Sequence, residues 1–254
     1  MEKGICKLCN DTLNLIGKSH IIPNFMYKGL FAENRKMRIA NLKDLTKKPE
    51  IAETGIFEKN ILCENCETRF SKHERYASHF FKGPTPSNIQ FEKRRSSDGQ
   101  RTIFVSGIDY GKLKLFFLSI LWRAHISEHK FFKEVNLDKI NEIEIKQMLL
   151  ENNSKSEEEY KIGMMIFQNS VNQLIPLLFN PTVRTIGTGK VGIFFINGYC
   201  YFIDLKPNSS LKIFDKVYIH KAGTIDVPIV HGKMAIELLV SLGINCEIAN
   251  NYVN

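Results

Sequence analysis

The stretches Cys6-Lys-Leu-Cys9 and Cys63-Glu-Asn-Cys66, with Ser19-His-Ile-Ile-Pro23 between them, decide the fold of this chain. A single Cys-x-x-Cys pair is a weak signal. Two pairs with the same two-residue gap supply four thiolates, which is the ligand set of a closed tetrahedral zinc site. We therefore predict a structural Zn²⁺ ion, and not a disulfide framework, at Cys6, Cys9, Cys63 and Cys66.

The composition is that of an ordinary globular protein. The chain has 254 residues, of which 43% are hydrophobic and 24% are charged, so it can bury a large core. It contains neither a long uncharged apolar run nor a secretion signal, and we expect no membrane span and a cytoplasmic location. Cys200 and Cys246 lie far from the two pairs and are expected to be small buried apolar side chains.

Positive charge is concentrated in the first part of the chain. Residues 1–100 carry 18 Lys and Arg against 12 Asp and Glu, which is +6 of the total net charge of +8. Basic clusters of this kind can neutralise phosphates, although solvated loops are an equal alternative for any one cluster. The candidate nucleic-acid-binding residues are Arg35, Lys36, Arg38, Lys47, Lys48, Lys93, Arg94 and Arg95.

The pattern predicts an α+β fold in two parts. Residues 1–82 are expected to form a zinc-bound ββα module, in which a hairpin follows the first cysteine pair and a helix begins at Cys66. Residues 83–101 are rich in Pro, Ser and Gly and read as a linker. Residues 102–254 are expected to form a domain of mixed helices and antiparallel strands that binds substrate, senses a signal or oligomerises.

The second part contains helix and strand signals of different strength. A broad apolar arc predicts a helix buried on most sides over 110–127, and Asp138 is a candidate N-cap for a helix over 137–150. In that second helix the apolar side is assigned to Ile140, Ile143, Met148 and Leu149. Strands are predicted over 161–167, 191–196 and 199–205, with a type I′ turn at Asn197-Gly198, and a last helix is predicted over 232–242.

The order of these motifs resembles the HNH endonucleases, also called ββα-metal or treble-clef nucleases. The resemblance covers residues 4–80 and rests on Cys6, Cys9, His20, Pro23, Leu62, Cys63 and Cys66. It implies a structural zinc at the cysteines and a histidine, His20, that activates water against a scissile phosphate. The whole chain is also similar to a group of uncharacterised bacterial proteins with the same layout.

The chemistry requires more than the cysteine site, because a four-cysteine zinc has no open coordination position. An imidazole can accept a proton from water near neutral pH, and a second divalent cation, such as Mg²⁺, can offset charge on the phosphate. Glu67 is expected at the start of the helix and could serve as the carboxylate ligand, so His20 and Glu67 are the candidate catalytic residues and the candidate ligands of the second ion. Members of the family commonly carry Asp or His where this chain has Ser19, and Asn or His where it has Glu67. Further candidate ligands are His73, Glu74 and Asn60.

Each of these polar residues also has a structural explanation. His20 could hold the zinc knuckle by a bond to a loop carbonyl, and His73 and Glu74 could belong to a solvated helix face. Trp122-Arg123-Ala-His125 could be a recognition edge, but core packing of the tryptophan is favoured. Gly187-Thr-Gly189-Lys190 lacks the spacing of a phosphate-binding loop and is interpreted as a turn.

The leading hypothesis is a metal-dependent HNH-like endonuclease that acts on nucleic acid, DNA before RNA, with a role in bacterial defence against phage or foreign DNA. The alternatives are a non-catalytic zinc-finger module that binds nucleic acid and a protein-interaction module. The second part could also bind a protein partner or a second copy of the chain.

Overall fold

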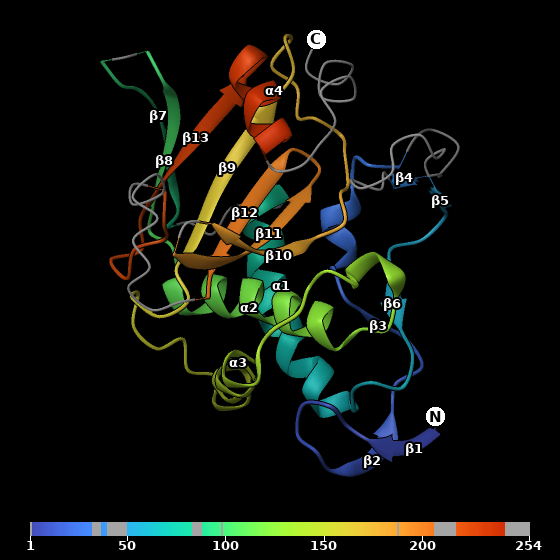
Figure 1. The fold of residues 1–254 in the computed structure, drawn as a ribbon. Coiled ribbons are helices and arrows are strands. Elements are labelled where there is room, and N and C mark those ends of the chain that lie inside the picture. The colour runs from blue at the N-terminus through green and yellow to red at the C-terminus, as the bar shows by residue number, and fades with distance from the viewer. Residues whose placement is uncertain are drawn as a thin grey trace.

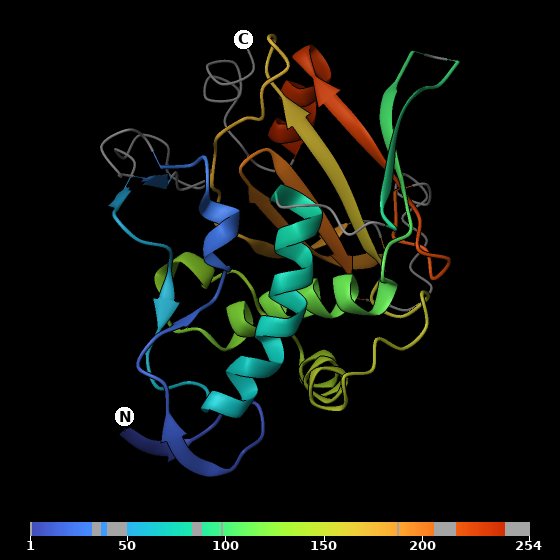
Figure 2. The same cartoon turned by 180° about the vertical axis from the view of Figure 1, so that it is seen from behind.

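A computed structural model describes residues 2–31, 37–39, 50–82, 88–97, 99–186, 188–205 and 217–241. Within these ranges the chain is α+β, with a seven-stranded sheet and four α-helices (Figures 1 and 2). The predicted fold class is confirmed at this level. None of the helices in the described ranges is long and apolar enough to cross a membrane.

Short strands and one long helix make up the N-terminal part. An antiparallel hairpin carries the first cysteine pair in its turn, and α1 begins next to the second pair. The remaining strands pair as β3 with β6 and β4 with β5. The elements are β1 (Glu2–Ile5), β2 (Thr12–Leu15), β3 (Ser19–His20), the 3₁₀ turn η1 (Asn24–Tyr27), β4 (Met37–Ile39), β5 (Glu50–Ala52), β6 (Phe57–Glu58) and α1 (Glu64–Lys82).

The large sheet has the strand order β10-β11-β12-β9-β13-β8-β7. All neighbouring pairs are antiparallel except β13 and β9, which run parallel. The strands are β7 (Gln90–Arg95), β8 (Arg101–Ser106), β9 (Ile162–Gln168), β10 (Thr182–Ile186), β11 (Gly189–Ile196), β12 (Tyr199–Asp204) and β13 (Ile225–His231). Residues 90–95, placed in the linker from sequence, therefore form a strand of this sheet.

Both faces of the sheet are covered by helices. Alternate residues of β12 point to opposite faces, so Tyr201 and Ile203 join the core shared with α2 (Tyr110–Ile126), while Cys200 and Phe202 join a second cluster. That second cluster includes Ala235 of α4 (Gly232–Ser241). Cys200 is a buried apolar side chain, as expected, whereas Cys246 lies outside the described residues.

The helix α2 is the centre of the molecule. Asp109 caps its N-terminus by accepting a hydrogen bond from the Lys112 N–H at 3.0 Å, and a continuous run from Leu113 to Ala124 is buried. The sheet lies on one side of α2 and α1 crosses it on another (Figures 1 and 2). The broad apolar arc predicted this burial, because a helix packed on several sides is apolar around most of its circumference.

The helix α3 (Lys139–Glu151) begins where the sequence predicts, with Asp138 accepting a hydrogen bond from the Asn141 N–H at 3.0 Å. Its predicted apolar side is partly wrong. Met148 and Leu149 are buried, but Ile140 and Ile143 are 71% and 51% exposed. The buried stripe of α3 consists of Asn141, Ile145, Met148 and Leu149, and Ile140 and Ile143 lie outside it.

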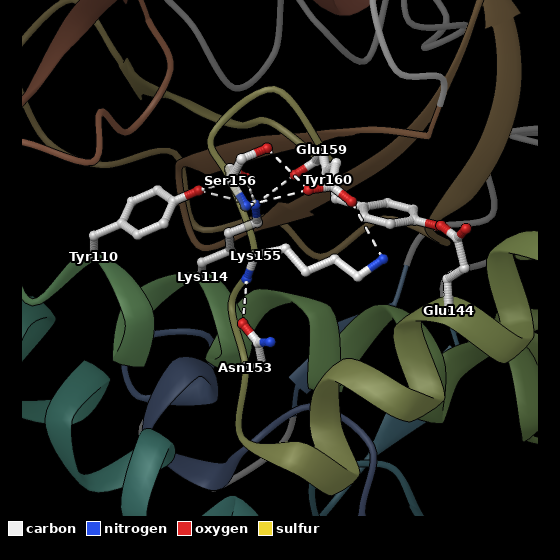
Figure 3. A network of polar contacts seen from close by, with 8 residues as sticks. All are labelled: Tyr110, Lys114, Glu144, Asn153, Lys155, Ser156, Glu159 and Tyr160. Carbon is white, nitrogen blue, oxygen red and sulfur yellow. Dashed lines mark hydrogen bonds and ion pairs between the residues drawn. The ribbon is translucent and has the colours of Figure 1, made fainter.

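A buried lysine joins α2 to the loop before β9 (Figure 3). The ammonium group of Lys114 donates to the Tyr110 hydroxyl at 2.9 Å, to the Ser156 carbonyl at 2.7 Å and to the Glu159 carbonyl. All three bonds lie within the protein, and the side chain is 1% exposed. Such a cation can be buried because each of its donors has an acceptor.

Candidate metal centre and histidine site

The four cysteines of the two pairs meet in one cluster. Their sulfur atoms all lie within 4.8 Å of one another, and Cys6, Cys63 and Cys66 are buried. A tetrahedral site with Zn–S distances of about 2.3 Å needs sulfur atoms about 3.8 Å apart. The cluster can therefore hold a metal ion such as zinc after only small side-chain movements.

Local backbone geometry brings the two pairs together. The turn between β1 and β2 is closed by the Cys6 N–H bonded to the Asp11 carbonyl at 2.9 Å and by the Asn10 N–H bonded to the Cys6 carbonyl at 2.8 Å. Asn10 has a φ of 66°, which a compact turn of this kind requires and which asparagine tolerates. The Lys7 N–H then bonds the Ile61 carbonyl at 2.9 Å, which ties the first pair to the segment before the second.

Backbone donors around the cluster favour a thiolate at Cys6. Burial raises the pKa of the Cys6 thiol, but N–H groups of Cys9, Cys63 and Leu8 outweigh that effect and lower this pKa to about 7. Burial raises the pKa of Cys9 to about 11. Only the thiolate binds zinc, so metal uptake would release protons from the remaining thiols.

His20 lies on β3, opposite Phe57 of β6. Its Nε2 atom is buried and has no hydrogen-bond partner among the described residues. Burial, followed by the positive charge of Lys18, lowers the pKa of His20, whereas Glu74 opposes the shift. The lowered pKa favours the neutral imidazole, and its Nε2 atom lacks a partner in the part of the chain that the structure describes.

A buried arginine from α2 holds the backbone of His20. Arg123 donates from Nη1 to the His20 carbonyl at 2.5 Å and from Nη2 to the Glu74 carboxylate at 2.7 Å. Its side chain is fully buried, and it donates further bonds of 3.2 Å to the backbone carbonyl and hydroxyl of Ser119. Arg123 thus links α1, α2 and β3 at one point.

The two acidic candidates on α1 each have one carboxylate oxygen engaged. Glu67 accepts from the Ser19 hydroxyl at 2.8 Å, and Glu74 accepts from Arg123. Burial raises the pKa of Glu67, although Arg123 and the Ser19 bond act against the shift. Ser19 therefore serves as a partner of Glu67 beside His20.

These groups do not form a second metal cluster. In the described part of the chain, only the four cysteines bring three or more Cys, His, Asp or Glu ligand atoms together. Asn60 is turned away, since its amide donates to Glu2 at 2.6 Å. His73 is only 5% exposed, so its placement on a solvated face is wrong, and its Nδ1 atom is buried without a partner.

The basic residues predicted to bind nucleic acid are only partly described. Lys93, Arg94 and Arg95 lie on β7, which is far from the β1–β2 hairpin in both views of the fold (Figures 1 and 2). Arg38 belongs to β4, but its side chain is not described. Arg35, Lys36, Lys47 and Lys48 lie outside the described residues.

Sequence reasoning missed the role of Arg123. The predicted core packing of Trp122 is confirmed, but Arg123, expected as a polar neighbour of that core residue, is buried as well. A signal was present, because an arginine within an otherwise apolar helix needs an internal acceptor. Neither the sequence nor its periodicity says that the acceptors are the His20 carbonyl and Glu74.

Comparison with known proteins adds no relative: no family model matches the chain, and no curated protein or solved structure is significantly similar to it.

Proposed function

We propose that the chain is a metal-dependent HNH-like endonuclease that hydrolyses phosphodiester bonds in nucleic acid, with DNA as the expected substrate. The observation that carries the proposal is the buried Nε2 atom of His20, which has no partner among the described residues. The four-cysteine cluster supports the proposal as the expected structural metal site. A buried polar atom without a protein partner calls for a water, an ion or a substrate group.

The proposed role of His20 is that of a general base. A lowered pKa keeps the imidazole neutral, which is the form that accepts a proton from an attacking water. The Arg123 bond to the His20 carbonyl would fix the strand that carries the imidazole. The cysteine cluster would support the hairpin and the start of α1, and it would take no part in the reaction.

The proposed catalytic Mg²⁺ ion would be bound partly by oxygen atoms of the substrate. Mg²⁺ is commonly bound by one or two carboxylates together with phosphate oxygens and water. Glu67 and Glu74 would be the protein ligands, each through the oxygen that Ser19 or Arg123 leaves open. Because the described residues supply no preformed cluster of three ligands there, we assign the ion no step in the reaction.

Cleavage assays with the purified chain test this proposal. Supercoiled plasmid and single-stranded RNA would be incubated with Mg²⁺ or Mn²⁺, using wild type, His20→Ala and His79→Ala. His79 is a matched control because it is a second histidine on α1 and the proposal gives it no role. We expect His20→Ala to reduce cleavage at least about 100-fold and His79→Ala to retain it. Cleavage that survives in His20→Ala would remove His20 from the mechanism.

A second candidate function is nucleic-acid binding without cleavage. It is favoured by the engagement of Glu67 with Ser19 and of Glu74 with Arg123, which leaves no open cluster for a catalytic ion. In that case His20 has only a structural role. Salt-dependent binding of DNA or RNA with no cleavage under either metal would support this function over the nuclease.

A further inference from the structure

The sheet divides at Pro228. Residues 225–228 of β13 pair with β8, whereas residues 229–231 pair with β9. Proline has no N–H to continue a ladder, and the pairing with β8 ends at Pro228. Beyond Pro228 the backbones of β13 and β8 are no longer paired. There the side chain of Gln100, just before β8, donates a hydrogen bond to the Ile229 carbonyl at 2.9 Å.

A pocket of about 580 Å³ lies at this division. Its volume falls within the range of small-molecule sites, about 300–1,000 Å³. Two isoleucines, Ile103 and Ile229, give it an apolar floor, and Gln168 and Asn172 contribute amide groups from the β9 side. The β1–β2 hairpin, which carries Cys6 and Cys9 in its turn, lies far from β7 and β8 (Figures 1 and 2).

The charged groups that the described residues bring to the pocket are all positive. Lys93, Arg94, Arg95 and Arg101 line it, and no carboxylate from the described part of the chain does. Arg94 is paired with Glu92 at 2.7 Å. None of the other three has a carboxylate within ion-pair distance in the described part of the chain. The like charges of Lys93, Arg95 and Arg101 repel one another, and an anion in the pocket would relieve that repulsion.

Arg101 has one guanidinium donor engaged within the protein and one buried donor that could bond a ligand. Its Nη1 atom donates to the Asn172 side chain at 3.0 Å, which orients the guanidinium. Its Nε atom is buried and has no acceptor among the described residues. A phosphate oxygen is the acceptor that suits a guanidinium edge best, because charge-assisted bonds to phosphate can be bidentate.

We propose that this pocket, which we name the β-fork pocket and define by Lys93, Arg95, Arg101, Gln168 and Asn172, binds the phosphate of a nucleotide. The cations hold the phosphate, the isoleucine floor accepts the base, and the amides of Gln168 and Asn172 bond the edge of the base or the sugar. A free nucleotide and a terminal nucleotide of a strand share this chemistry. The inference is independent of the proposed nuclease reaction.

Calorimetric titration of the full chain at about 150 mM salt tests the proposal. The probes are a nucleoside monophosphate, the matching nucleoside, inorganic phosphate, and a short single strand with or without a 5′-phosphate. The variants are Arg101→Gln and the double variant Lys93→Gln/Arg95→Gln. The control is Lys3→Gln/Lys133→Gln, which removes two exposed charges elsewhere.

We expect saturable binding of the monophosphate or of the 5′-phosphorylated strand, and which of the two binds identifies the source of the phosphate. Each pocket variant should weaken binding at least about tenfold, while the control double variant and His20→Ala bind as wild type. The double variant on the exposed β7 keeps the test valid if Arg101→Gln fails to fold. The proposal is overturned if neither phosphate probe binds, if the nucleoside binds equally well, or if the pocket and control variants weaken binding equally.

Discussion

Arg123 is the residue on which the arrangement around His20 depends. It is fully buried and bonds both the His20 carbonyl and the Glu74 carboxylate. A buried ion pair is stable only while both groups are present. If one group is removed, the other remains buried without a partner, and its desolvation is no longer offset. The interaction also joins the N-terminal strands to the central helix.

Replacing Arg123 by Met should destabilise the protein by about 3–5 kcal/mol, because the Glu74 carboxylate and the His20 carbonyl would lose their buried donor. Urea denaturation followed by circular dichroism measures the change. The double variant Arg123→Met/Glu74→Gln should recover part of the loss. As a control, Lys139→Ala breaks an exposed pair with Glu142 and should cost less than about 1 kcal/mol. A cost for Arg123→Met as small as that of the control would contradict the role assigned to Arg123.

At the residue scale, the sequence predicted the cysteine cluster but not the contacts of His20. Two Cys-x-x-Cys pairs in one chain are typical of a single metal site, and the structure brings the four sulfur atoms together. The partner of Glu67 is Ser19, 48 positions earlier in the chain, and the partner of the His20 carbonyl is 103 positions away. Such long-range contacts leave no periodic signal in the sequence.

At the scale of elements, strong local signals were reliable. Asn197 and Gly198 have φ values of 52° and 78°, as a type I′ turn requires, and they join β11 to β12. The predicted helices α2, α3 and α4 are present. The prediction for the apolar side of α3 is wrong because Ile140 and Ile143 lie outside the buried stripe, which the polar Asn141 joins instead. No core-facing pattern marks β7 in the sequence, because its six residues are all exposed.

The link between α2 and the loop before β9 depends on Lys114 (Figure 3). Desolvation lowers the pKa of Lys114 to about 8, although Glu159 and Glu157 oppose the shift. In the unfolded chain the pKa of a lysine is about 10.4. Between these two values the unfolded chain binds more protons than the folded one, so this group makes stability rise with pH.

We therefore expect the free energy of unfolding of the wild type to increase by about 1–2 kcal/mol from pH 8 to pH 9.5 relative to that of Lys114→Met. Below pH 8 the two curves should run parallel. Chemical denaturation at half-unit steps of pH measures both. Parallel curves across the whole interval would show that Lys114 stays charged in the folded protein.

At the scale of the whole molecule, one core extends from the cysteines to the sheet. Cys6, Cys63 and Cys66 belong to the same apolar cluster as Phe116 of α2 and Ile203 of β12. The predicted division at residues 82 and 102 is therefore crossed by continuous packing. The defence role, the cytoplasmic location and the oligomeric state stay predictions.

Because the core is continuous, removal of zinc should affect the entire chain. We expect a strong chelator to lower the melting temperature by about 10 °C or more in a single transition. Differential scanning calorimetry of wild type, Cys63→Ser and Cys200→Ala tests this. The chelator effect should persist in Cys200→Ala and disappear in Cys63→Ser. Two separate transitions, with only one sensitive to the chelator, would contradict a shared core.

The most direct test of the account is the metal content of the purified chain, measured by elemental analysis together with X-ray absorption at the zinc edge. We predict one zinc ion per chain with four sulfur ligands at about 2.3 Å, and loss of that ion in Cys63→Ser. A wild-type chain without zinc, or zinc with nitrogen and oxygen ligands in place of sulfur, would contradict it.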